Sequence, residues 1–144
     1  MSLRIACITA ALCLSACQQG TGGANAPGTS AEGFTGISEN EVITALGNEP
    51  FWNARITGGE LLYATPENSA GATIAVDRFI GQGGLGFSGT LQGEKFDLLV
   101  TPGTCSDTMS DRTYPYTATL QIGGEQRNGC AYTDQQPYQG DAAP

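Results

Sequence analysis

The 144-residue chain is acidic and glycine-rich: it carries 14 Asp and Glu against six Lys and Arg, has no His, and has a formal net charge of −8 at pH 7. This length allows one small domain. The charge argues against nucleic-acid binding, which needs clustered Lys and Arg, and the lack of His excludes Ser-His-Asp and Cys-His catalysis and His-based metal sites. We therefore expect no enzyme, no cofactor and no metal. An acidic surface can attract a basic protein partner, although it can also serve solubility alone.

Residues 1–16 have the pattern of a signal peptide, in which Arg4 precedes an apolar run from Ile5 to Leu14 that is too short to span a bilayer. The four residues that end at Cys17, Leu-Ser-Ala-Cys, resemble the lipobox of bacterial lipoproteins. The resemblance implies cleavage before Cys17 and lipidation of its thiol. Gln18 in the next position implies, in Gram-negative lipoproteins, sorting to the outer membrane with the domain in the periplasm. The alternative is an ordinary secretory signal that is cleaved nearby.

The segment after Cys17 is poor in apolar residues and contains six Gly between residues 18 and 40. Such a composition cannot bury enough surface to fold. We therefore predict a lipidated cysteine and flexible linker over residues 17–40, a β-domain over 41–134, and a disordered polar tail over 135–144.

Within the β-domain, apolar residues alternate with polar ones and glycine-bearing turns separate the runs. Period-2 alternation indicates strands with one buried face. The predicted strands are one around Val42 and Ile43, then Trp52–Thr57, Glu60–Thr65, Ala72–Ile80, Leu85–Gln92, Lys95–Thr101, Tyr114–Ile122 and Glu125–Thr133, with a loop over Pro66–Gly71. Pro115 has no backbone N–H to donate to a neighbouring strand. Its strand therefore starts at a sheet edge, or the proline lies outside the regular pairing. These elements predict an all-β fold, an antiparallel meander of about seven or eight strands. It is either a small barrel or a sandwich, and closure into a barrel would remove exposed edges.

The five cysteines divide into three groups by their predicted roles. Cys7 and Cys13 lie in the predicted signal peptide, and Cys17 is the predicted lipidation site. Cys105 and Cys130 remain as an even pair in a chain exported to an oxidising compartment. We predict that they form one disulfide.

Four residues are candidates for a binding site: Glu49, Trp52, Asp107 and Arg112. A Trp beside a carboxylate, and an Arg beside Asp111, could line a recognition pocket. The alternative is structural: Trp52 fills the end of the core, Glu49 pairs with a backbone amide or with Arg112, and Asp107 caps a turn.

Three motifs suggest a relationship: Gly47-Asn-Glu-Pro-Phe-Trp52, then Cys105-x-Asp-x-Met-Ser-Asp-Arg-x-Tyr-Pro115, then Gly129-Cys-Ala131. They resemble a family of uncharacterised proteobacterial envelope lipoproteins associated with META-type and lysozyme-inhibitor-like lipoprotein domains. The family has no settled activity, so more than one class of function stays open. The acidic surface, the lipid tether and the disulfide favour a tethered binding module, with inhibition of a cationic cell-wall hydrolase such as lysozyme as one alternative and a structural or stress-related envelope component as another. Relatives often carry Gly where this chain has Thr108, so a positive φ there would strain the backbone.

Overall fold

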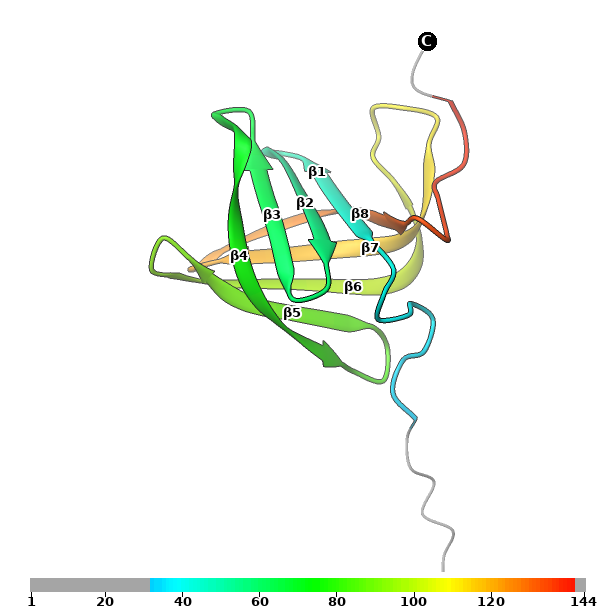
Figure 1. Ribbon diagram of the computed structural model, residues 1–144. Coiled ribbons are helices and arrows are strands. Elements are labelled where there is room, and N and C mark those ends of the chain that lie inside the picture. Colours follow the sequence, from blue (N-terminus) through cyan, green and yellow to red (C-terminus); the bar gives the residue numbers. More distant parts are fainter. Residues whose placement is uncertain (1–31, 142–144) are drawn as a thin grey trace, which may run out of the picture.

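The computed structural model describes residues 32–141, which form a closed barrel of eight antiparallel strands (Figure 1). The strands follow chain order, each pairs with the next, and the last pairs with the first. Their bounds are β1 (Ile43–Asn48), β2 (Phe51–Thr57), β3 (Glu60–Thr65), β4 (Asn68–Ile80), β5 (Leu85–Leu91), β6 (Glu94–Ser106), β7 (Thr113–Ile122) and β8 (Glu125–Thr133). The predicted all-β meander with one disulfide is confirmed, and it is a barrel instead of a sandwich.

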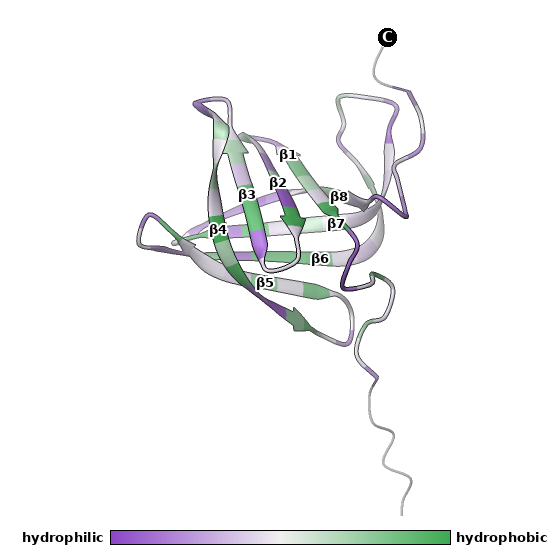
Figure 2. Cartoon of the chain, viewed as in Figure 1, coloured by the Kyte–Doolittle hydropathy of each residue, from purple (hydrophilic) through white to green (hydrophobic). Residues whose placement is uncertain are grey.

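The barrel interior is filled with apolar side chains that alternate along the strands. On β2, for example, Trp52, Ala54 and Ile56 are buried while their neighbours are exposed. Phe96, Leu98 and Leu120 are fully buried at the centre. Figure 2 shows hydrophobic residues recurring along the strands and hydrophilic ones at the β3–β4 and β5–β6 turns. In an eight-stranded barrel the interior is just wide enough for side chains to fill, so burial of these residues stabilises the closed form.

Among the strands with predicted ranges, two boundaries differ from the prediction by more than one residue. The expected loop over Pro66–Gly71 is wrong, because β4 already begins at Asn68, which pairs with Thr65 across a tight turn. Gly and Ser in this stretch are typical of loops, but the pairing with β3 keeps them extended. β6 continues past Thr101 to Ser106, through an irregularity in its register with β7.

That irregularity accommodates Pro115. The β6–β7 register shifts between Pro102 and Cys105, and the pairing of β7 with β8 begins only at Tyr116. Pro115 therefore lies outside the regular pairing on both sides, which was the second of the two alternatives.

The predicted linker is wrong over its last part, because residues 33–37 pack against the barrel. Ile37 is only 3% exposed and belongs to the core, and Phe34 packs against it. The Phe34 amide donates to the Gly81 carbonyl at 2.8 Å, and the Tyr116 hydroxyl donates to the Gly36 carbonyl at 3.2 Å. Phe34 and Ile37 are too few for a sequence pattern, but they are enough to bind this segment to an existing core. Residues 17–31 lie outside the described part.

The predicted disordered tail is also wrong over residues 135–141. The amides of Thr113 and Gln139 each donate to the other residue's carbonyl, at 2.8 and 2.9 Å. Tyr138 packs against Tyr114 and Tyr132 at centroid distances of 5.6 and 5.1 Å. The aromatic contacts therefore hold a segment whose composition is polar. Within residues 32–141, the structure contains no helix long and apolar enough to cross a bilayer.

Candidate functional site

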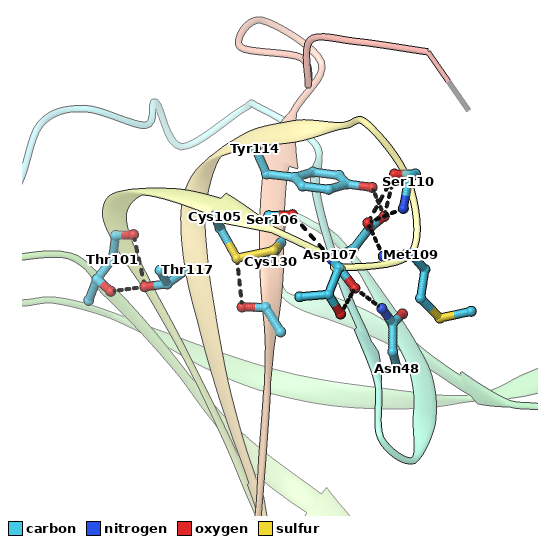
Figure 3. The surroundings of a disulfide bond; sticks show 12 residues. Asn48, Thr101, Cys105, Ser106, Asp107, Met109, Ser110, Tyr114, Thr117 and Cys130 are labelled. Carbon is cyan, nitrogen blue, oxygen red and sulfur yellow. Dashed lines mark hydrogen bonds between the residues drawn. A yellow bond between two sulfur atoms is a disulfide. The ribbon is translucent and has the colours of Figure 1, made fainter. Parts of the chain in front are cut away.

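The disulfide between Cys105 and Cys130 is confirmed, and it joins β6 to β8 (Figure 3). Both strands pair with β7, so the bond bridges the two neighbours of that strand. It links residues 25 apart in sequence, with their Cα atoms 5.5 Å apart. The bridge holds the end of β6, and with it the start of the following loop, against the barrel wall.

The β6–β7 loop, residues 107–112, is organised by the carboxylate of Asp107. This carboxylate accepts hydrogen bonds from the Met109 and Ser110 amides at 3.1 and 2.9 Å, and from the Ser110 hydroxyl. The Tyr114 hydroxyl donates to the second carboxylate oxygen at 3.0 Å. Figure 3 shows these groups converging on Asp107, with the Asn48 amide donating to its backbone carbonyl. Asp107 therefore caps the loop turn, as the structural alternative predicted.

The electrostatics of Asp107 follow from this network. Burial by itself raises the pKa of the carboxyl, but the hydrogen bonds from Ser110, Met109 and Tyr114 favour the charged form and together bring the pKa below its usual value. The hydrogen bonds of the Asp107 carboxylate are thus made within the loop and to Tyr114 just after it. Met109, in contrast, is 58% exposed on the same loop.

Thr108 has a φ of 60°, in the left-handed region. This conformation is costly for a β-branched residue, so the strain foreseen for this position is present. Two local hydrogen bonds offset part of it: the Thr108 amide donates to the Ser106 hydroxyl at 3.2 Å, and the Thr108 hydroxyl donates to the Asp107 carbonyl at 2.7 Å.

Trp52 lies inside the barrel and is only 3% exposed. Its indole covers two glycines, one on β1 and one on β8. A Cβ on Gly47 would lie 2.2 Å from the Trp52 Nε1, and a Cβ on Gly129 would lie 3.0 Å from its Cζ2 and 2.0 Å from the Leu46 carbonyl oxygen. The indole nitrogen has no hydrogen-bond partner among the described residues. Trp52 thus fills the core where β1 meets β8, and the glycines of two sequence motifs make room for it.

A groove of about 560 Å³ lies between the β6–β7 loop, the end of β1 and the strands β7 and β8. Hydroxyl and amide side chains contribute much of its lining: Asn48, Ser106, Thr108, Thr117, Thr119, Gln126 and Asn128. Glu49 and Asp107 are the acidic residues of the lining, so two of the four predicted site residues meet here. Glu49 is exposed, and its carboxylate forms no ion pair with any residue of the described chain. We call this surface the loop groove.

Arg112 is not part of the loop groove. Its guanidinium carbon lies 4.4 Å from the ring centroid of Tyr138, in the ordered C-terminal segment. This is the geometry of a cation–π contact. The predicted pairing of Glu49 with Arg112 does not occur, since Arg112 stacks on the segment that composition assigned to the tail.

The sequence analysis missed Arg127, which faces the barrel interior from β8. Its inward direction could have been predicted, because Arg127, Gly129 and Ala131 are spaced by two and therefore lie on one face of the strand.

The fold and these contacts define a disulfide-stapled, closed β-barrel with a hydrogen-bonded surface loop. Comparison with protein-family models, curated proteins and solved structures found no match for the chain. Among residues 32–141, no group of three or more His, Cys, Asp or Glu is placed to hold a metal ion.

Proposed function

We propose that this protein is a binding module of the cell envelope, tethered to the outer membrane through a lipidated Cys17, and that its loop groove receives a basic protein partner. The signal-like residues 1–16 and the lipobox-like residues up to Cys17 support the tether. The charge supports the partner class, because the chain from residue 32 to 141 contains all 14 acidic side chains and only five basic ones. A partner of opposite charge is attracted to such a surface and associates faster.

The observation that carries the proposal is a loop fixed by a disulfide and a hydrogen-bond network, beside a carboxylate that forms no ion pair among the described residues. The disulfide and the Asp107 network hold the loop in one conformation, while Met109 on that loop stays exposed. Side chains that are already ordered lose less conformational entropy on binding, so a preorganised surface binds more tightly. Glu49 adds a free negative charge to the groove wall, where a Lys or Arg of the partner would bind.

The test uses the lipid-free protein, residues 18–144, immobilised and exposed to envelope extract. We expect basic proteins to be retained at low salt and released as salt rises, because screening weakens exposed charge pairs. The Glu49→Gln variant should lose this retention. The Glu60→Gln variant is the matched control, since Glu60 is also exposed and carboxylate-bearing but lies on the β2–β3 hairpin outside the groove lining. Equal retention by both variants would exclude the loop groove as the binding surface.

A second candidate function is inhibition of a cationic cell-wall hydrolase, which the acidic charge and the resemblance to lysozyme-inhibitor-like lipoproteins support. A lysozyme assay at low and moderate salt tests it directly. Absence of inhibition at micromolar protein would rule out this candidate. If envelope extracts also yield no salt-sensitive partner, a structural or stress-related envelope role is the better explanation.

The tether is tested independently of the groove. Mass spectrometry of the mature protein should find an acylated N-terminal Cys17, and Cys17→Ala should release the protein from membranes. An unacylated mature N-terminus would refute the lipoprotein assignment while leaving the groove proposal intact.

A further inference from the structure

The open end of the barrel, beneath the β3–β4, β5–β6 and β7–β8 turns, holds a second pocket, of about 470 Å³, whose lining shares only Arg127 with that of the loop groove. Its apolar wall includes Phe51, Leu91 and Ile122, and its polar groups include Tyr63 and Arg127. A volume of this size is within the range of small-molecule sites, and barrel mouths are a common place for them. We call it the mouth pocket.

Arg127 points into the barrel. It pairs with Leu120 on β7, which is fully buried, and directly opposed residues of two strands face the same side of the sheet. The Arg127 side chain is 17% exposed. A position packed against the core in this way is ordinarily apolar, because a charge must be desolvated to occupy it.

The guanidinium of Arg127 has donors to spare. Its Nη1 donates to the Tyr63 hydroxyl at 2.7 Å, and its Nε and Nη2 donate to the two carboxylate oxygens of Glu125, each at 3.1 Å. A guanidinium has five N–H groups, so two of them, one on each terminal nitrogen, have no partner among the described residues. The remaining N–H group of each terminal nitrogen is therefore able to donate to a carboxylate oxygen.

We infer that the mouth pocket binds a small amphipathic carboxylate, whose acid group meets Arg127 and whose apolar part lies against Phe51, Leu91 and Ile122. Glu125 competes for the same cation. Its side chain is 59% exposed beside the β7–β8 turn, so it can swing into solvent when a ligand carboxylate takes its place. Glu67 also lines the pocket and adds a second negative charge. The apolar wall is therefore needed for affinity, and a simple inorganic anion would bind poorly.

The probe is sodium octanoate, titrated into the full lipid-free protein by calorimetry, with the neutral 1-octanol as its uncharged match. We expect octanoate to bind and octanol to bind at least about tenfold more weakly, since a charge-assisted hydrogen bond contributes about that factor. Arg127→Met should reduce octanoate affinity by a similar factor. Glu125→Gln should increase it severalfold, because it removes the competing carboxylate.

The opposite signs of these two variants distinguish a binding site from a merely structural ion pair. If Arg127→Met unfolds, as circular dichroism would reveal, Glu125→Gln alone still tests the inference. Glu60→Gln, at an exposed carboxylate that lines neither the mouth pocket nor the loop groove, should leave octanoate binding unchanged. No octanoate binding at millimolar concentration, equal binding of octanol, or weaker binding by Glu125→Gln would each overturn the inference.

Discussion

Replacing Gly47 with alanine should destabilise the barrel strongly, because the Trp52 indole occupies the space that a side chain would need. The new Cβ would lie 2.2 Å from the Trp52 Nε1 and 2.6 Å from the Asn128 carbonyl oxygen. One of these atoms belongs to the β8 backbone and the other to a ring enclosed by the core. Neither can move without disturbing the contact between β1 and β8.

The expected cost follows from two opposing effects. Overpacking a core costs about 1–3 kcal/mol and occasionally more, and the backbone contact places this site at the upper end. Removal of a glycine restricts the unfolded chain, which returns about 0.4–1 kcal/mol. We therefore expect a net loss of about 2 kcal/mol. With a urea m-value of about 1–3 kcal/mol per molar for a small domain, the unfolding midpoint falls by roughly 1 M.

The assay is urea unfolding, followed by the fluorescence of Trp52, the only Trp in the chain. Gly83→Ala is the matched control, because a Cβ there meets no atom within 4 Å. Its free energy of unfolding should change by less than about 0.5 kcal/mol. The Gly47→Ala, Trp52→Phe double variant, followed by circular dichroism, should lose less free energy of unfolding than the two single variants lose together. The reason is that each substitution relieves part of the packing defect that the other creates. If Gly47→Ala unfolded at the same urea concentration as Gly83→Ala, the packing explanation of this motif would be wrong.

Three further predictions concern the loop and its staple. Replacing both Cys105 and Cys130 with alanine should lower the free energy of unfolding by about 3–4 kcal/mol through loop entropy, and an unchanged urea midpoint would contradict this. Thr108→Gly should raise stability by about 0.5–1 kcal/mol, because glycine adopts the observed φ of 60° without strain, whereas Thr108→Ala should not; thermal unfolding of the two variants compares them. Asp107 has a lower pKa in the folded chain than its ordinary value, so the folded state binds fewer protons. Its contribution to stability is complete above the unfolded pKa of about 3.9 and is lost as pH falls through the lower folded pKa. Asp107→Asn should remove this acid sensitivity, and parallel stability curves for the two proteins between pH 5 and pH 2 would refute it.

The strands that could be predicted are those in which apolar and polar residues alternate within the strand itself. The alternation of Tyr114, Tyr116, Ala118 and Leu120 predicts β7 without knowledge of any neighbour, and the buried face matches. The start of β4 was missed for the opposite reason. Asn68 to Gly71 has no hydrophobic alternation, and only pairing with β3 makes it a strand.

The candidate site was predictable where its residues act locally. Asp107 caps residues two and three positions ahead, which its sequence position alone suggests. Arg112 was misplaced because its contact, Tyr138, lies 26 positions later in a segment of polar composition. Likewise, the sequence predicts Ile37 to lie in a linker, because its burial depends on the barrel end against which it packs. Contacts between distant segments are decided by the closed barrel, which no local pattern encodes.

The pairing of β1 with β8 also orders events in time. A ribosome makes β1 first and β8 last, so the ladder from Ile43–Thr133 to Leu46–Cys130 cannot form until nearly the whole chain has emerged. Until then the edge of β1 presents unpaired backbone groups, which can pair with other chains. The barrel can therefore close only when β8 is present, and a chain that stops before β8 leaves the edge of β1 unpaired.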